Sequence, residues 1–316
     1  MKEGGRVVVL CGGYSSSERE ISLKGGEEVY RALASTLSTA KIQLDRDEIP
    51  KKLDPKTDVI FPILHGEFGE DGQLQRLLEV AGFNFAGSDS QSSALCMNKL
   101  RAKTLALELG INTAKFIELE CRQYEYAELS DVFSGRPFVL KPVGKGSSVG
   151  INKILSRNDW LAVCDEILKG HWFLEEHVTG REITVPILGH KSLPTIEITP
   201  KNGFYDYRHK YTAGMTEYTL PAKVERHLAD MLVECAEKMY AHCGCRDFGR
   251  IDFIVSPKGG ATFLEVNTIP GMTTTSLLPK SAACNGLSFT ELCIKMIIPA
   301  LDRAGISLKN VLLSSK

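Results

Sequence analysis

Two apolar segments near the C-terminal end of the chain, residues 251–255 and 261–267, carry acidic side chains among large hydrophobic ones. A Pro-Lys-Gly-Gly turn lies between them, and this order predicts an antiparallel hairpin. An ionised carboxylate in such apolar surroundings loses hydration that its neighbours cannot replace. The pattern therefore indicates that another group compensates the charge.

Asp252, Glu265 and Asn267 are the candidate metal ligands of this hairpin. We expect Asp252 and Glu265 to face each other across the two strands, while Glu265 and Asn267, two residues apart, project from the same face. Two carboxylates and one amide oxygen, without cysteine or histidine, suit Mg²⁺ or Mn²⁺ bound together with phosphate. The alternative is a surface hairpin whose acidic residues face solvent, and the combination of three ligands favours the metal site.

The first 90 residues alternate between apolar strands and helices. Residues 6–11 form an apolar run that ends in two glycines, and we expect a helix over residues 18–34. A second buried strand is expected at residues 59–64, followed by an acidic loop and a helix within residues 69–81. This order predicts an open parallel α/β sheet with ligands at the carboxyl ends of its strands, where the polar loops 14–17 and 66–71 follow.

The remaining sequence predicts two further domains. For residues 91–176 the expected elements are a helix at 98–109, strands at 138–142 and 151–154, a helix at 158–168 and a strand at 172–176. For residues 177–316 they are strands at 181–188 and 193–198, a helix at 223–242, the hairpin and C-terminal helices. A chain of 316 residues with 43% hydrophobic content can bury a sizeable core, and its length favours two or three domains. The order of elements favours three, which we place at 1–90, 91–176 and 177–316.

A loop rich in glycine and serine, residues 144–150, joins the two strands of the central hairpin. Its glycines free backbone amides, its serines add hydroxyl groups, and Lys141 and Lys145 add positive charge, so the loop can hold phosphate. The sequence is not the GxxxxGK[ST] pattern, and a strand rather than a helix is expected after it. A flexible turn is the alternative, but Lys141 and the metal ligands together favour a nucleotide site.

Other polar positions are expected near this loop. Glu175 and Glu176 end a buried strand, where their oxygens can accept hydrogen bonds from an adenine amino group or from ribose hydroxyls, and Lys99 is expected beside Lys141. A solvated strand end and a surface lysine are the alternatives. Residues 205–221 form a 17-residue loop with four tyrosines. That length and aromatic content predict a lid that excludes water from the site.

Charge and hydropathy limit the classes of partner. The 38 basic and 39 acidic residues give a net charge of -1, which favours neither nucleic acid nor a membrane surface as a partner. The first apolar run is too short for a signal peptide, and no segment approaches the roughly 20 apolar residues of a spanning helix. We therefore expect a cytoplasmic protein whose nine cysteines are reduced.

Eight ordered motifs resemble those of D-alanine:D-alanine ligases, members of the ATP-grasp superfamily, over essentially the whole chain. They are GGYSSSEREISL, LHGEFGEDGQLQ, GSDSQSSALCMNKLRAK, VLKPVGKGSSVG, GREITV, FYDYRHKYTAGMTEY, GRIDFIV and FLEVNTIPGMTTTSLLP. The resemblance implies a three-domain ATP-grasp fold of α/β and α+β class. Its parts would be an N-terminal open parallel sheet that binds substrate, a small central α+β domain, and a C-terminal domain built on an antiparallel sheet.

The resemblance also implies an activity. Such ligases join two D-alanines for peptidoglycan precursor synthesis. The carboxylate of the first D-alanine attacks the γ-phosphoryl group of ATP, which gives ADP and an acyl phosphate, and the amine of the second then displaces phosphate. Two Mg²⁺ or Mn²⁺ ions are implied as cofactors, and a homodimer is implied as the assembly.

The nucleotide and metal residues follow from the matching motifs. Asp252, Glu265 and Asn267 are implied to hold the two ions, with Glu265 shared between them. The residues implied to contact phosphates are Lys99, Lys141 and Lys210. The residues implied to bind the adenosine part are Glu175, Glu176, Val178 and Glu182.

The amino-acid substrates have their own implied contacts. Glu18 would bind the ammonium group of the first D-alanine, linked to Ser147 and Tyr211 by hydrogen bonds that close the lid. The groups implied to stabilise the oxyanion are Arg250 and the amide of Gly271. The groups implied to surround the carboxylate of the second D-alanine are Ser276, the amide of Leu277 and His65.

Two points leave alternatives open. The loop between Gly13 and Glu18 is one residue longer than the family spacing, so Glu20 is the alternative to Glu18. Tyr211 favours D-alanine as second substrate, whereas another ATP-grasp ligase, such as a D-alanine:D-lactate ligase, would use a different lid. A non-catalytic nucleotide-binding regulator is the remaining alternative. It predicts the loss of metal ligands or phosphate lysines, and all of those positions are filled here.

Overall fold

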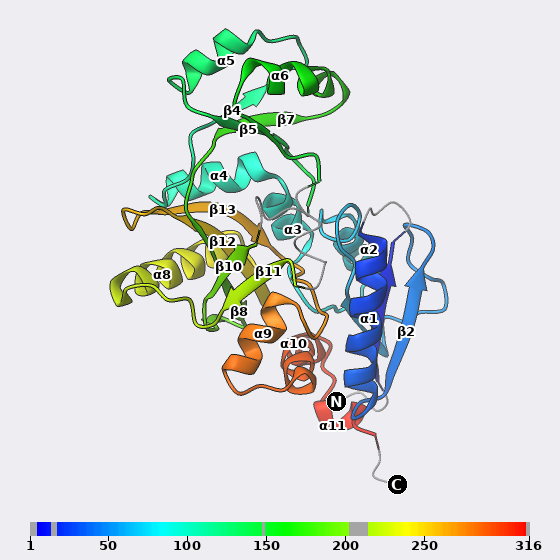
Figure 1. Cartoon of the computed structure of the whole chain (residues 1–316). Helices are drawn as coiled ribbons and strands as arrows, with labels where there is room; N and C mark the ends of the chain where they lie inside the picture. The colour runs from blue at the N-terminus through cyan, green and yellow to red at the C-terminus, as the bar shows by residue number, and fades with distance from the viewer. Residues whose placement is uncertain (1–4, 14–17, 147–148, 202–213, 314–316) are drawn as a thin grey trace.

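The computed structural model describes residues 5–13, 18–146, 149–201 and 214–313, and these residues build three β-sheets (Figure 1). The sheets follow one another along the chain, first a parallel one, then a small antiparallel one, and last a larger antiparallel one. In Figure 1 the small sheet and its helices project from the rest of the molecule. The expected combination of α/β and α+β parts is confirmed.

The N-terminal sheet is parallel and covered on both faces. Its strands, in the order β2-β1-β3, are β1 (Arg6–Gly12), β2 (Thr39–Leu44) and β3 (Asp58–Pro62). Because successive side chains of a strand point to opposite faces, Val7 and Val9 pack toward α1 (Arg19–Ala34) and α10 (Phe289–Arg303), while Val8 and Leu10 pack toward α2 (Gln73–Val80). The open parallel sheet expected from the sequence is therefore present, although strand β2 was not expected.

The small central sheet is antiparallel, with strand order β4-β7-β5-β6. Its strands are β4 (Phe116–Leu119), β5 (Phe138–Pro142), β6 (Asn152–Ile154) and β7 (Trp172–Glu176). One face packs on α5 (Tyr126–Val132), α6 (Arg157–Val163) and the 3₁₀ helix η1 (Cys164–Lys169), with Trp160 fully buried. Strands β5 and β6 pair as the hairpin predicted on either side of the glycine-serine loop.

The C-terminal sheet has six strands and carries the predicted metal hairpin. The path β11-β10-β8-β12-β13 consists of β11 (Thr216–Thr219), β10 (Ile196–Pro200), β8 (Arg181–Leu188), β12 (Phe248–Val255) and β13 (Ala261–Asn267), and β9 (Lys191–Ser192) pairs with β8. Helix α8 (Arg226–His242) and helix α4 (Lys99–Glu108) cover one face around Ile251 and Phe253. Arg250 and Asp252 lie on the opposite face, which these two helices do not cover.

Short helices link the sheets. Helix α3 (Ser90–Met97) runs directly into α4, and Asn98 caps α4 by accepting from the Arg101 amide at 3.0 Å. Lys99 therefore occupies the first position of α4. The C-terminal helices α9 (Leu277–Cys284), α10 and α11 (Leu308–Val311) pack back toward the N-terminal sheet through Leu278, Leu292 and Val311.

Several predicted boundaries need correction. The strand expected at residues 193–198 is wrong in its limits, since β10 begins at Ile196 and the short β9 precedes it. The helix expected at 158–168 is an α-helix followed by a 3₁₀ turn. Residues 216–219 of the predicted lid loop form strand β11, because they add an edge strand to β10. Most of that loop lies outside the described residues.

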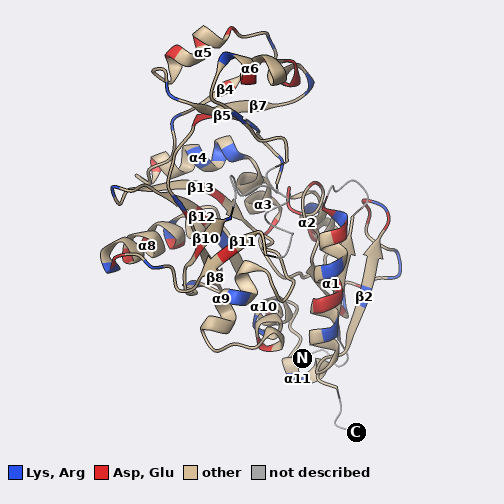
Figure 2. Cartoon of the chain, viewed as in Figure 1, with Lys and Arg blue, Asp and Glu red and all other residues tan. Residues whose placement is uncertain are grey.

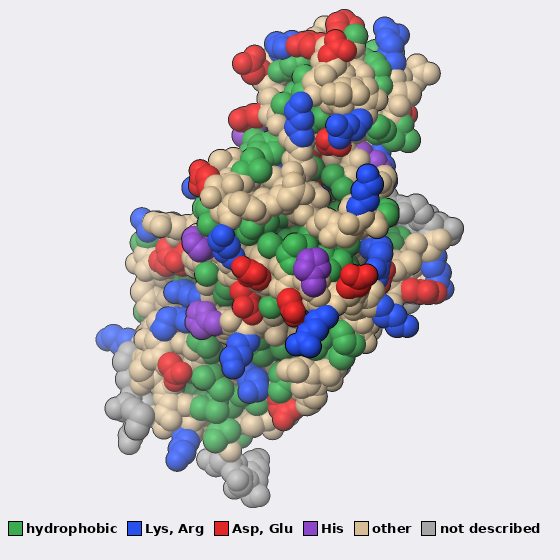
Figure 3. Space-filling model, turned by 90° about the vertical axis from the view of Figure 1, so that its left-hand side faces the viewer, with side chains coloured by type: hydrophobic (Ala, Val, Ile, Leu, Met, Phe, Trp, Pro, Cys, Tyr) green, Lys and Arg blue, Asp and Glu red, His purple; other side chains and the backbone are tan. Residues whose placement is uncertain are grey.

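The surface charges are mixed. Basic and acidic side chains alternate along α1 in Figure 2, and both signs are interspersed on the face seen in Figure 3. All nine cysteines lie in the described part of the chain and are free thiols. Within that part no single helix is long and apolar enough to cross a membrane; helices α9 and α10 reach the required length and composition only as a pair bent by 106°.

Candidate active site

The hairpin of β12 and β13 has the register that the sequence predicted. Asp252 lies opposite Glu265, and Arg250 lies opposite Asn267. Strand alternation sends Ile251 and Phe253 into the core. The same alternation turns Arg250 and Asp252 toward the open side of the sheet, so the charged residues of the hairpin share one face.

Asp252 is only 3% exposed and is surrounded by donors. Arg250 donates from Nε to Oδ1 at 2.9 Å and from Nη2 to Oδ2 at 2.8 Å. Thr184 on β8 donates its hydroxyl to Oδ1 at 2.5 Å, and the Asn267 amide nitrogen donates to Oδ2 at 3.0 Å. These bonds replace the hydration that the carboxylate loses on burial. They therefore offset the free-energy cost of placing an ionised carboxylate among apolar residues.

The chemistry of this set fits a hard divalent ion. Asp252, Glu265 and Asn267 offer oxygen atoms on adjacent strands, and Mg²⁺ prefers such ligands together with phosphate and water. In the structure Asn267 presents its amide nitrogen to Asp252, so coordination through oxygen requires its amide to turn. Among the described residues no group of three or more His, Cys, Asp or Glu side chains is arranged for a metal, and the predicted set contains only two such residues.

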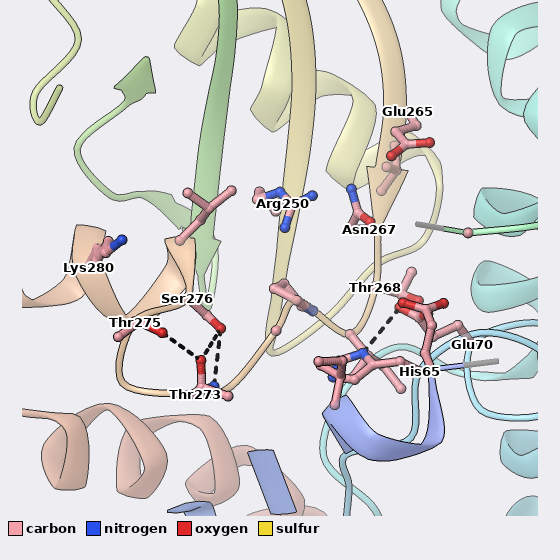
Figure 4. A pocket seen from close by; sticks show the side chains of 18 of the residues that line it. His65, Glu70, Arg250, Glu265, Asn267, Thr268, Thr273, Thr275, Ser276 and Lys280 are labelled. Carbon is pink, nitrogen blue, oxygen red and sulfur yellow. Dashed lines mark hydrogen bonds and ion pairs between the residues drawn. The ribbon is translucent and has the colours of Figure 1, made fainter. Parts of the chain in front are cut away.

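Two cavities meet at this hairpin. One has a volume of about 500 Å³ and lies between the N-terminal part and α9 (Figure 4). The other has a volume of about 420 Å³ and lies between the small central sheet and the C-terminal sheet. Lys99 and Glu265 line both cavities, and Lys99 Nζ is 3.7 Å from Glu265 Oε2. Lys99 also donates to the backbone oxygen of Lys145 at 2.5 Å, which ties it to the glycine-serine loop.

The 500 Å³ cavity is lined by residues that the resemblance assigned to binding of the amino-acid substrates. The predicted residues that line it, besides Lys99 and the metal ligands Glu265 and Asn267, are Glu18, His65, Arg250, Gly271, Ser276 and Leu277. Glu18 is buried, whereas Glu20, its alternative, is exposed and does not line the cavity. The geometry therefore favours Glu18.

The wall around Ser276 is ordered by local hydrogen bonds. The hydroxyls of Ser276 and Thr273 lie 2.8 Å apart, and the Thr273 amide donates to the Ser276 hydroxyl at 3.2 Å (Figure 4). Ser276 precedes α9, so Leu277 begins a helix whose first amides have no partner within the helix. A side chain at Gly271 would place Cβ 3.0 Å from the Ser276 hydroxyl, so glycine keeps this corner open.

His65 is a buried member of the same wall. Burial by itself would lower its pKa, but the nearby carboxylates of Glu70 and Glu18 outweigh burial, and the pKa is raised above 6.5. Glu70 Oε1 lies 4.0 Å from His65 Nδ1, and Oε2 accepts from the Gly66 amide at 2.6 Å. Glu70 was not singled out from the sequence, although its loop was.

The 420 Å³ cavity collects the residues that the resemblance assigned to the nucleotide. Those that line it, besides Lys99, are Lys141, Glu175, Glu176, Val178 and Glu182, and the proposed metal ligands Asp252 and Glu265 line it as well. Glu176 pairs with Arg136 at the rim. Glu175 is 3% exposed and pairs with both Lys141 and Lys103. Burial would raise the pKa of Glu175, but the two lysines lower it to about 2.

Three predicted site residues fall in segments that the structure does not describe. Ser147, Lys210 and Tyr211 lie outside the described residues. Lys103 and Thr184 are the partners of Glu175 and Asp252 that the sequence did not reveal. A lysine within a helical pattern and a threonine within a strand carry no signal of their own, because their importance comes from contacts with distant strands.

The chain is similar in sequence and in fold to proteins of one family. The family models for the D-Ala D-Ala ligase N-terminus and C-terminus match residues 38–88 and 105–298. The D-alanine–D-alanine ligase of Aquifex aeolicus is 44% identical over 297 residues, covering 93% of this chain and 99% of that protein. The ligase of Anaeromyxobacter sp. is 41% identical over 305 residues, covering 95% and 98%. The crystal structure of the Bacillus anthracis ligase complexed with ATP superposes with a TM-score of 0.81 at 30% identity, covering 96% and 99%.

Proposed function

The chain belongs to the D-alanine–D-alanine ligase family, and from that membership we propose that it uses ATP to join two D-alanines into D-alanyl-D-alanine for cell wall synthesis. The products are the dipeptide, ADP and phosphate. The reaction must bring a nucleotide and two amino acids together. The observation that carries the proposal is that Lys99 and Glu265 line both the 500 Å³ and the 420 Å³ cavity. The two cavities therefore meet at these residues, as the transfer of a group from a nucleotide to an amino acid requires.

ATP would occupy the 420 Å³ cavity. Lys141 lines that cavity, and Lys99 lines both cavities. The ammonium groups of these two lysines would contact the phosphates. Val178 and the carboxylates of Glu175, Glu176 and Glu182 line the part of the cavity where the adenosine would lie. The γ-phosphate would then point past Glu265 toward the substrate cavity. Lys210, from the lid sequence, would add a third cation.

Asp252, Glu265 and Asn267 would hold two Mg²⁺ or Mn²⁺ ions. When bound, such ions neutralise charge on the phosphates during transfer. The support for this proposal is the donor set itself, which contains two carboxylates and an amide on adjacent strands. Arg250 already holds Asp252 through two hydrogen bonds and would keep that carboxylate oriented.

The 500 Å³ cavity would hold the two D-alanines. Glu18 would accept from the ammonium group of the first, with Ser147 and Tyr211 completing that contact. The first carboxylate oxygen would form a bond to the γ-phosphorus while the bond to ADP breaks. The bound carboxylate thereby becomes an acyl phosphate, whose phosphate is a good leaving group. No side chain needs to act as a covalent nucleophile.

The second D-alanine would lie near α9. The Ser276 hydroxyl and the Leu277 amide would hold its carboxylate, with His65 close by, and its amine would attack the acyl carbon. Arg250 and the Gly271 amide would then stabilise the negative oxygen of the tetrahedral intermediate. Collapse of that intermediate breaks the bond from the acyl carbon to the phosphate oxygen and releases phosphate.

The test is ATP-dependent phosphate release with D-alanine against a panel of amino and hydroxy acids, with the products identified by mass. We expect D-alanyl-D-alanine as the main product when D-alanine and D-lactate are offered together at neutral pH. Depsipeptide as the main product would identify a D-alanine:D-lactate ligase instead. Nucleotide binding without phosphate release under any of these conditions would indicate a non-catalytic regulator.

Three further predictions have separate tests. We propose domain limits at 1–90, 91–176 and 177–316, which limited proteolysis can locate. We propose a homodimer, which sedimentation equilibrium can measure, and a cytoplasmic location, which cell fractionation can establish.

A further inference from the structure

Lys103 is a buried lysine that lines neither cavity. Its side chain is 1% exposed, on the inner face of α4. Its Nζ lies 2.9 Å from Glu175 Oε2 and donates to the Thr113 hydroxyl at 2.6 Å. A lysine is almost never buried to this degree without a charged partner. Glu175 is that partner, and it is also the partner of Lys141.

The three charges form a line from the interior to the nucleotide cavity. Lys103 lies at the inner end and pairs with Glu175 on β7, whose side chain is 4% exposed, and Glu175 pairs with Lys141 on β5, whose side chain is 13% exposed. Glu175 and Lys141 both line the cavity, and Lys103 does not. The sum is one net positive charge. Without Lys103 the carboxylate of Glu175 would be balanced by Lys141 alone, and little of the Lys141 charge would remain for a polyphosphate.

The inner end of the line is anchored to the metal hairpin. The Thr113 hydroxyl accepts from Lys103 and donates to the backbone oxygen of Phe263 at 2.9 Å. Thr113 and Phe263 also form a parallel β-bridge. Phe263 is two residues before Glu265, so Lys103 connects the strand of the proposed metal ligands with the strands that hold Glu175 and Lys141.

We propose that Lys103 is a positioning residue for nucleotide binding: it holds Glu175 from the interior, so that Lys141 stays at the cavity and keeps its positive charge available to phosphate. This inference rests on the proposed function, because it takes ATP as the occupant of the 420 Å³ cavity. Lys103 itself does not touch the nucleotide. Its effect passes through Glu175.

The first test is Lys103→Met, which removes the ammonium group and retains an unbranched chain. We expect KM for ATP to rise by about tenfold or more, with KM for D-alanine and kcat changed by less than about threefold. Thr113→Val is the matched control, since it loses the hydrogen bond to Lys103 but keeps all three charges. It should lower the melting temperature and leave KM for ATP within about twofold of the wild type.

The double variant Lys103→Met/Glu175→Gln separates charge balance from packing. It is compared with Glu175→Gln, because Glu175 lines the nucleotide cavity and its loss alone is expected to raise KM for ATP. Since Lys103 is proposed to act through Glu175, the two variants should have the same KM for ATP within about threefold. If Lys103→Met does not fold, the double variant decides by itself. A KM for ATP within about threefold of that of Glu175→Gln supports the inference, and a larger rise overturns it.

Two other results would overturn the inference. One is an equal rise in KM for ATP and D-alanine in Lys103→Met, and the other is a KM for ATP in Lys103→Met that stays within about threefold of the wild type. Failure of the proposed function would look different, because wild-type protein would then release no phosphate with D-alanine. In that event the binding of ADP, measured by calorimetry on the same variants, still tests the role of Lys103.

Discussion

Lys99 Nζ lies 3.7 Å from Glu265 Oε2, and these two residues form part of the wall of both cavities. Lys99 opens helix α4 and Glu265 lies near the end of β13, so two separate elements place opposite charges at one point. In the proposed function a phosphoryl group would pass from the nucleotide in one cavity to the carboxylate in the other at this point. The pair therefore marks where the proposed chemistry takes place.

Glu265→Gln should abolish ligation. The change keeps the shape of the side chain but removes the charge that would hold the metal ions, and we expect kcat to fall by about 100-fold or more. Phosphate release in saturating Mg²⁺ measures the effect. Glu108→Gln, at an exposed position on α4, is the control and should retain wild-type turnover. Near-normal turnover of Glu265→Gln would refute the metal role.

Arg250→Lys should lower kcat by about 100-fold while the affinity for ATP changes little, because lysine cannot reproduce the paired hydrogen bonds to Asp252 or a guanidinium at the oxyanion. Arg6→Lys is a matched control. Arg6 makes a similar paired contact with Asp58, at 2.7 and 3.1 Å, and neither residue lines either cavity. Equal losses of activity in the two variants would mean that Arg250 acts only through folding.

Gly271→Ala should raise KM for D-alanine by about tenfold, since the added Cβ meets the Ser276 hydroxyl at 3.0 Å. KM for ATP should stay close to the wild-type value. Gly260→Ala is the control, because a Cβ there meets its nearest atom at 3.5 Å in the exposed hairpin turn. Steady-state kinetics with each substrate varied separately provides the measurement, and a change confined to ATP would contradict the assignment of the two cavities.

The His65 site predicts a pH dependence. The pKa of His65 in the folded chain is raised above 6.5, so its pairing with Glu70 stabilises the fold fully below pH 6.5, and this stabilisation is lost as pH rises through the raised pKa. Glu70→Gln should lower the pKa of His65. An NMR titration of the histidine ring measures it, and Glu67→Gln, exposed in the same loop, should leave it unchanged. A pKa that does not move in Glu70→Gln would contradict this account.

Local patterns were enough to predict the hairpin. Alternating apolar residues on both sides of a Pro-Lys-Gly-Gly turn define two strands, and strand alternation then fixes which face carries Asp252 and Glu265. The glycine-serine hairpin of β5 and β6 was predictable for the same reason. These features depend on neighbours in the sequence, so the sequence displays them directly.

Other features depend on distant contacts and were missed. Strand β2 is buried only at Ile42 and Leu44, so it lacks the continuous apolar run of β1. Helix α3 begins with polar residues and follows Asp89 as its cap, and its pattern resembles a loop. Lys103 becomes notable only when β7 brings Glu175 against it. Strand β11 forms because β10 provides an edge, which the tyrosine-rich sequence does not indicate.

The most direct test of carboxylate activation follows an oxygen atom. D-alanine labelled with ¹⁸O in its carboxylate is incubated with unlabelled ATP and the enzyme, and the released phosphate is analysed by mass spectrometry. We predict one ¹⁸O atom in each phosphate, because the carboxylate oxygen that attacks the γ-phosphorus leaves with it when the amine displaces the acyl phosphate. Dipeptide formed together with unlabelled phosphate would contradict the account.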